Sequence, residues 1–174
     1  MFSPLIFCLF RIRDNAGLSR KQCSLQDLED FVDMHSAIPT SDDTPNVVKS
    51  SIDATEEHIC VVISSKKIQK QILSKPKKKM LMLDFTHDLS SDHLLVGIIG
   101  TPNVKHEFSP ICVALASSEN SRCAAEMLEW TRDLSDGPTV AVLADGSRAL
   151  SKAIRDVFDP AETERVMCYT HMIR

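Results

Sequence analysis

Residues 139–169 read TVAVLADGSRALSKAIRDVFDPAETERVMCY, and the pattern in this stretch decides the fold. Residues 139–143 form a short apolar run, which predicts a buried strand. Ser147 is placed to cap a helix that ends at residues 159–160, an Asp-Pro pair. A second strand is predicted at residues 165–169. Because a helical connection returns the chain in its original direction, the two strands should be parallel.

The preceding part of the chain predicts three further strands and a helix. Residues 80–86, 93–100 and 107–116 are rich in β-forming residues, which favours antiparallel hairpins. The breaks between them fall at residues 90–92 and 101–103. Apolar residues then recur at helical spacing over residues 119–134. Three antiparallel strands followed by helix, strand, helix and strand predict an α/β protein with a ribonuclease-H-like sheet, incomplete at its C-terminus.

A doubly wound nucleotide-binding sheet is the alternative that the same pattern leaves open. Such sheets bind phosphates at a glycine-rich turn between a strand and a helix. No predicted strand of this chain is followed by a glycine-rich phosphate loop. The ribonuclease-H-like arrangement is therefore favoured.

The N-terminal third is predicted to be simpler. Ser24 and Asp27 have the spacing of a capping box, which favours a short helix through Met34. Residues 36–57 combine proline, serine, threonine and acids without apolar periodicity, which is typical of a linker. We therefore divide the chain into residues 1–57, a leader, short helix and acidic linker, and residues 58–174, the compact domain.

The compact domain is expected to begin with a strand and a short helix. Residues 59–63 are an uninterrupted apolar run of strand length. Ser64 or Ser65 can then cap a helix that carries Ile68 on its apolar side. With 174 residues, of which 43% are hydrophobic, the chain is long enough for one core.

The charge distribution argues against broad binding to nucleic acid. The net charge is −4, and non-specific affinity for phosphate backbones comes mainly from lysine and arginine. Residues 27–57 hold nine acids against one lysine, whereas residues 66–79 hold seven lysines. Any DNA contact should therefore be local.

The cysteines and the N-terminus bear on the compartment. The six cysteines are scattered without the paired spacing of a disulfide framework or a complete zinc site, which favours a reducing compartment. The apolar residues 1–10 are too short to span a bilayer and lack a basic start and a cleavage pattern. We expect an N-terminal leader rather than a signal peptide, and no membrane partner.

Two aspartates are the candidate functional residues. Asp84 lies within the apolar run LMLDF, where an acid is costly inside a sheet unless it is paired or bound to metal. Asp145 follows the strand at residues 139–143 directly, at the end where α/β sheets commonly place ligands. Two simpler interpretations remain open: Asp84 as an acid on an edge strand facing water, and Asp145 as part of an ordinary Asp-Gly-Ser turn.

The order of these features resembles the Mutator-like element (MULE) transposases. The resemblance rests on LMLDFTHD around Asp84, on the strand and turn at Asp145, and on the terminal Cys168-x-x-His171. It implies that Asp84 and Asp145 are catalytic ligands of Mg²⁺ or Mn²⁺ in DNA cleavage and strand transfer. It also implies that the partner is DNA at transposon ends and that the full-length form is a homo-oligomer.

The chain departs from the family at two points. Phe85 replaces a small residue after the first aspartate, although its side chain should point to the other face of the strand. The third acid of the family has no counterpart: Glu162 and Glu164 precede the final strand, and Glu119 is interpreted as a first-turn acid of a helix. We therefore expect a transposase core truncated before its third acid. The alternative is a catalytically inactive remnant or interaction module.

Two further motifs have weaker implications. Cys168 and His171 supply half of a tetrahedral zinc site, so zinc is not expected in this chain alone, and a packing or substrate-contact role is favoured. The basic cluster of Lys75, Lys77, Lys78 and Lys79 has three interpretations: a solvated helix end, a nuclear import signal, or a DNA-backbone contact. The import signal and the resemblance together predict a nuclear protein.

Overall fold

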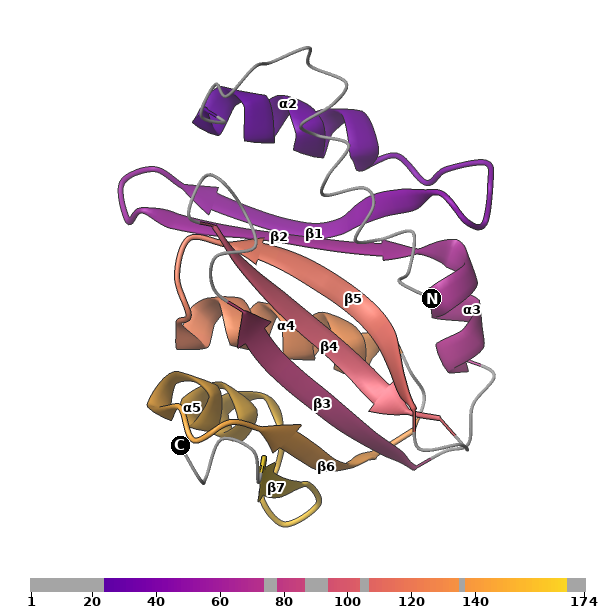
Figure 1. Cartoon of the computed structure of the whole chain (residues 1–174), viewed down its shortest axis with the longest axis vertical. Coiled ribbons are helices and arrows are strands. Elements are labelled where there is room, and N and C mark those ends of the chain that lie inside the picture. The colour runs from indigo at the N-terminus through magenta and orange to yellow at the C-terminus, as the bar shows by residue number, and fades with distance from the viewer. Residues whose placement is uncertain (1–23, 74–77, 87–93, 104–106, 135–136, 169–174) are drawn as a thin grey trace.

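The computed structural model describes residues 24–73, 78–86, 94–103, 107–134 and 137–168. These residues form a mixed α/β protein built on a seven-stranded sheet with the strand order β1-β2-β5-β4-β3-β6-β7 (Figure 1). The strands are β1 (Pro45–Asp53), β2 (His58–Ser65), β3 (Lys79–Thr86), β4 (Leu95–Pro102), β5 (Phe108–Ala116), β6 (Thr139–Ala144) and β7 (Glu164–Met167). The helices are α2 (Leu25–His35), α3 (Lys66–Leu73), α4 (Ser121–Asp133) and α5 (Arg148–Val157).

The predicted strand directions are confirmed in the part of the sheet that carries the two aspartates. β3 pairs antiparallel with β4, and β4 pairs antiparallel with β5. β6 lies parallel to β3, and β7 lies parallel to β6. The break predicted at residues 101–103 is displaced, because β4 continues through Pro102 and the turn is closed by Asn103 and Glu107. The break predicted at residues 90–92 lies outside the described residues.

The linker predicted over residues 36–57 is wrong for residues 45–53. These residues form β1, which pairs antiparallel with β2, and β2 continues the sheet beside β5. β1 is an edge strand: it starts with a proline, contains a bulge, and leaves its polar side chains other than Asn46 at least partly exposed. A strand of this kind lacks the apolar run that a sequence pattern detects, since pairing with β2 supplies much of its stability. The division predicted at residue 58 thus falls between two paired strands.

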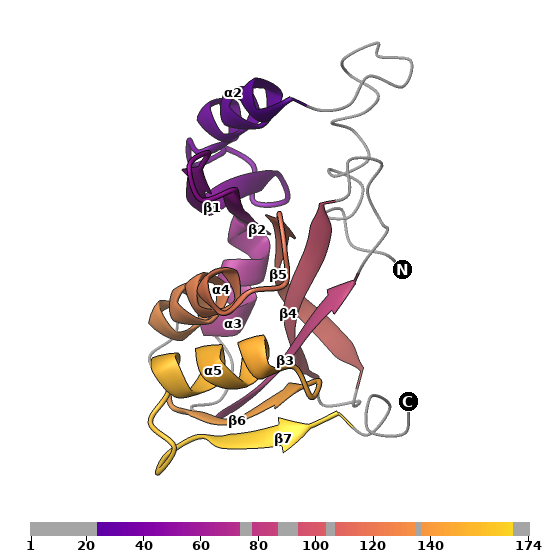
Figure 2. The same ribbon diagram turned by 90° about the vertical axis from the view of Figure 1, so that its left-hand side faces the viewer.

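The larger core lies between the sheet and two helices on one face. Helices α4 and α5 lie side by side over the central strands (Figure 2). Met127 and Leu128 of α4 and Leu150 of α5 are fully buried against Leu81 of β3 and its neighbours. The apolar helix faces that the sequence predicts are therefore the faces that cover the sheet.

A smaller core lies on the opposite face near the first strands. Leu28 of α2 packs there with Val47 of β1, Val61 of β2 and Val113 of β5. The predicted capping box at the start of α2 is confirmed: the Ser24 hydroxyl accepts from the Asp27 amide, and the Asp27 carboxylate accepts from the Ser24 amide. None of the described helices has the length and apolarity needed to cross a membrane.

Candidate functional site

Asp84 and Asp145 come from neighbouring parallel strands. Asp84 lies near the end of β3, and Asp145 follows the last residue of β6. In the register of this pair Met82 stands opposite Leu143, so continuing it by two residues sets Asp84 opposite Asp145. The prediction that the strands leading to the two residues are adjacent is confirmed, whereas the convergence of the two carboxylates stays a prediction. Both residues are partly buried at the carboxyl end of their strands.

Asp84 projects from the sheet face opposite α4 and α5. Its neighbours Leu83 and Phe85 are buried in the core beneath those helices, and successive side chains of a strand alternate between faces. The interpretation of Asp84 as an acid on an edge strand is wrong, because β3 lies between β4 and β6. The expectation that Phe85 points away from Asp84 is confirmed.

Phe85 fits beneath α4 because its cross-strand neighbour is a glycine. Gly97 of β4 stands directly opposite Phe85. A Cβ atom at Gly97 would lie 2.8 Å from Cε1 of the Phe85 ring and 3.0 Å from Sδ of Met127. The bulky residue that follows Asp84 is therefore accommodated by the missing side chain on the next strand.

Asp145 opens a tight turn into α5. Its Oδ1 accepts a hydrogen bond of 2.8 Å from the Ser147 amide, so the carboxylate supports the helix start. Ser147 occupies the predicted cap position, but its side chain makes no capping hydrogen bond. The interpretation of Asp145 as a turn residue is thus confirmed for one of its carboxylate oxygens.

Arg165 of β7 holds this turn from the other side. Its Nη2 donates to the Asp145 carbonyl oxygen at 2.6 Å, whereas its buried Nε finds no hydrogen-bond partner among the described residues. Arg165 is not among the site residues predicted from the sequence. Its only signal was its position at the start of the strand predicted beside the Asp145 strand.

Cys168 also lies beside the Asp145 turn, at the carboxyl end of β6. Its amide donates to the Ala144 carbonyl oxygen at 2.8 Å, which places it beside the Asp145 turn. The Cys168 side chain is half-buried. His171, the other half of the motif, lies outside the described residues, so its role stays a prediction.

The two described lysines of the basic cluster, Lys78 and Lys79, are not beside Asp84. Lys79 is the first residue of β3 and Asp84 is the sixth, so they are separated by about 16 Å at roughly 3.3 Å per residue. Lys78 is exposed at the same end as Lys79. A DNA-backbone contact by these lysines beside the strand that bears Asp84 stays a prediction, and such a contact would lie at the opposite end of β3 from Asp84. Lys75 and Lys77 lie outside the described residues.

The basic helix α3 is partly neutralised by the acidic segment before β1. The Nζ atoms of Lys67 and Lys70 lie 2.8 Å from Asp43 and 2.5 Å from Asp42, respectively. The hydrogen bond from Lys70 lowers the pKa of Asp42, and the hydrogen bond to Asp43 raises the pKa of Lys67. These exposed pairs leave less unpaired positive charge for a phosphate backbone.

The acid at the start of α4 differs from its prediction. The helix begins at Ser121, and Asn120 is its N-cap, with its side chain accepting a 2.8 Å hydrogen bond from the Cys123 amide. Glu119 therefore precedes the cap and is not in the first turn. The first-turn assignment is wrong because the asparagine side chain caps a helix that starts at Ser121, two residues after Glu119.

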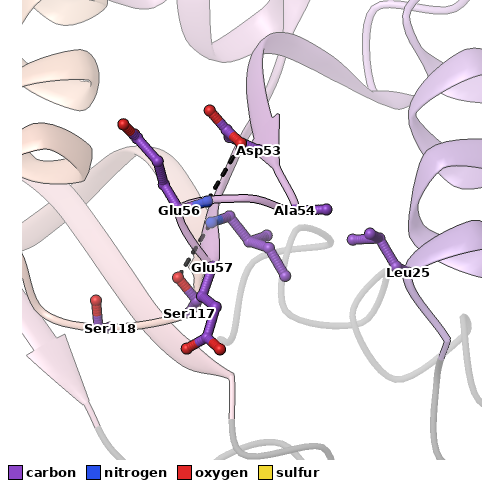
Figure 3. A pocket seen from close by; sticks show the side chains of 8 residues that line it. Leu25, Asp53, Ala54, Glu56, Glu57, Ser117 and Ser118 are labelled. Carbon is purple, nitrogen blue, oxygen red and sulfur yellow. Dashed lines mark hydrogen bonds between the residues drawn. The ribbon is translucent and has the colours of Figure 1, made fainter.

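A hollow of about 520 Å³ lies elsewhere, between the β1–β2 turn and the end of β5. Figure 3 shows Asp53, Glu56 and Ser117 around it. The Asp53 carboxylate accepts from the side chain and amide of Thr55 and from the Glu56 amide, and the Thr55 bonds lower the Asp53 pKa. These hydrogen bonds give the carboxylate a structural role in the turn.

The carboxylates of the described residues do not by themselves enclose a metal ion. No group of three or more histidine, cysteine, aspartate or glutamate side chains in these ranges is arranged to hold a metal ion. The half-buried carboxylates of Asp84 and Asp145 are hard oxygen donors of the kind that Mg²⁺ prefers, with water or phosphate completing its shell. This donor chemistry fits a magnesium or manganese ion.

Comparisons with known proteins show no family. No family model matches the chain, and no curated protein matches it. One similar solved structure is the Drosophila P element transposase strand transfer complex, with 12% sequence identity and a TM-score of 0.41. The similarity covers 86% of this chain and 36% of that one. A likeness this slight does not establish a common fold or function.

Proposed function

We propose that this chain is a ribonuclease-H-like domain of a DNA transposase of the MULE type, in which Asp84 and Asp145 bind Mg²⁺ or Mn²⁺. The observation that supports the proposal is the parallel pairing of β3 with β6, whose register, continued by two residues beyond Met82 and Leu143, would set the two aspartates opposite each other at the carboxyl ends of these strands. The motifs around both residues are those that resemble the family. The proposed partner is DNA.

The strand order supports this fold assignment. β3, the first strand of the three-stranded antiparallel part, has β4 on one side and β6 on the other. β6 and β7 extend the sheet in parallel beyond it, each reached through a helix. This arrangement brings the carboxyl ends of β3 and β6 together, and open α/β sheets commonly bind ligands outside the carboxyl ends of parallel strands.

The chemistry follows from carboxylates at such an edge. Phosphodiester cleavage can use two metal ions about 3.5–4 Å apart, which activate the attacking oxygen and stabilise the leaving oxygen. Asp84 and Asp145 would each contribute oxygen ligands, and the phosphate would supply others. Arg165 would fix the backbone of the Asp145 turn, since it donates to the Asp145 carbonyl oxygen.

A second candidate is an interaction module without catalysis. It is favoured by the absence of a three-ligand group within the described ranges and by the engagement of Asp145 Oδ1 with the Ser147 amide. In this alternative, the fold persists while the two acids serve only the sheet and the turn. The two candidates differ in whether Asp84 and Asp145 bind an ion together.

Titration of the ¹⁵N-labelled chain with Mg²⁺ separates the candidates. We expect weak binding that shifts the amides of Asp84, Asp145 and Ser147 first, because two carboxylates without phosphate make an incomplete shell. Asp84→Asn and Asp145→Asn should each abolish these shifts. The matched control is Asp42→Asn, which changes an acid that already pairs with a lysine and should leave them unchanged.

The same Mg²⁺ titration in the presence of DNA tests whether Asp84 and Asp145 bind the ion together with a phosphate group. A short duplex should tighten the binding of Mg²⁺, because phosphate oxygens complete the coordination of the ion. Shifts confined to residues 42–57, with no effect of either asparagine substitution, would exclude the metal site and leave the interaction module.

A further inference from the structure

Two buried cysteines that are distant in sequence meet between the sheet and α4. Cys60 is the third residue of β2, and Cys123 lies in the first turn of α4. Both are fully buried and are free thiols, and their Sγ atoms are 2.6 Å apart. Non-bonded atoms in a protein core are usually about 3.5–4 Å apart. The distance between the two sulfur atoms is shorter than this and approaches the length of a disulfide bond, about 2.05 Å.

The surroundings make the folded pair a poor nucleophile. Hydrogen bonding with Cys123 raises the pKa of the Cys60 thiol, and burial and the nearby Glu126 carboxylate raise it further. The Glu126 carboxylate, whose Oε1 lies 3.5 Å from Nε2 of the buried His58, is the acidic group that acts on the Cys60 thiol. Thiol exchange requires a thiolate, and these contacts disfavour it.

Of the other described cysteines, neither shares this arrangement. Cys112 of β5 is buried, and burial raises its pKa to about 12, but its Sγ lies 3.9 Å from the Thr131 hydroxyl. Cys168 follows β7, on the opposite side of β3 from β2. Cys112 therefore serves as a matched buried control for the Cys60–Cys123 pair.

We propose that Cys60 and Cys123 form a disulfide when the chain folds under oxidising conditions, and that the bond fastens α4 to β2. The oxidant is a small disulfide such as oxidised glutathione. One protein thiolate attacks it and releases one glutathione thiol; the second protein thiolate then displaces the other glutathione, so two protein thiols become one disulfide and two glutathione thiols form. Folding or local opening provides access to the sulfurs.

Loop length explains why this bond would stabilise the sheet. The two cysteines are 63 positions apart, and the loop between them contains β3, β4 and β5. Closing a long loop restricts the unfolded chain strongly. The oxidised chain should melt roughly 10 °C above the reduced chain at this size.

Peptide mapping of the full chain tests the proposal. The protein is unfolded, refolded in a mixture of reduced and oxidised glutathione, alkylated in denaturant, and digested with trypsin without reduction. We expect residues 50–66 and 123–132 to appear as one cross-linked species that is two hydrogens lighter than the separate peptides. Cys112→Ala should retain this species and the higher melting temperature of the oxidised chain.

Cys123→Ala should remove both the cross-link and the difference in melting temperature between oxidised and reduced protein. The wild-type map requires no substitution and remains decisive if this variant fails to fold. Complete alkylation of Cys60 and Cys123 in the refolded protein would overturn the proposal. Equal cross-linking of Cys60 to Cys112 and to Cys123 would do the same.

Discussion

Replacing Gly97 with alanine should destabilise the chain by about 1–3 kcal/mol, the usual cost of overpacking a core. The new methyl group would lie 2.8 Å from the Phe85 ring and 3.0 Å from Met127 Sδ, and both side chains are held in the core beneath α4. Gly146→Ala is the matched control. No atom lies within 4 Å of a Cβ at Gly146, so this change should be neutral or stabilising by up to about 1 kcal/mol.

A double-mutant cycle assigns the cost to the ring. Phe85→Leu alone should cost about 1 kcal/mol, a typical value for a point substitution. In the double variant the smaller leucine leaves room for the methyl group at residue 97, so the two effects should fall short of additivity by about 1 kcal/mol or more. Urea denaturation measures each free energy of unfolding. Gly97→Ala with wild-type stability, or additivity within about 0.5 kcal/mol, would refute the packing argument.

Three further outcomes are expected. Arg165→Met should lower the free energy of unfolding by about 1.5–3 kcal/mol, because it removes the charged hydrogen bond to the Asp145 carbonyl oxygen. Arg155→Met, at an exposed arginine, should lower it by less in the same urea denaturation assay, and equal losses would contradict a stabilising role of Arg165. Thr55→Ala should raise the Asp53 pKa toward its ordinary value in a carboxyl NMR titration, because the side-chain hydrogen bond from Thr55 lowers that pKa. The stabilisation from this bond is present above the pKa of Asp53 in the unfolded chain and is lost as pH falls through its pKa in the folded chain. An unchanged Asp53 pKa would count against the contact. The chain alone should not nick supercoiled plasmid with Mg²⁺ or Mn²⁺, since a poorly held second metal ion commonly lowers the rate of cleavage by on the order of 10² or more. Nicking that disappears in both Asp84→Asn and Asp145→Asn would contradict this and show that another ligand completes the site.

The sequence predicted the elements whose patterns are local. The buried strand before Asp145, the apolar stripe of α4 and the capping box at Ser24 each depend on residues close together in the chain. The direction of β6 and β7 followed from the helices that precede them, because such connections return the chain in parallel. Adjacency of the Asp84 and Asp145 strands was predicted from the resemblance, and pairing of β3 with β6 bears it out.

The missed features depend on distant partners. β1 is stabilised by pairing with β2, so its own polar sequence resembles a loop. The contact of Arg165 with the Asp145 carbonyl spans 20 positions, and that of Cys60 with Cys123 spans 63. Neither contact leaves a spacing signal in the chain.

Crystals of the chain grown with Mn²⁺ and a short DNA duplex test the central claim most directly. We expect anomalous density from Mn²⁺ at the carboxyl ends of β3 and β6, bonded to one carboxylate oxygen of Asp84, one of Asp145 and a phosphate oxygen of the DNA. Asp84→Asn crystals grown in the same way should lose that density. Carboxylates directed away from each other, with Mn²⁺ only on the acidic residues 42–57, would contradict the account.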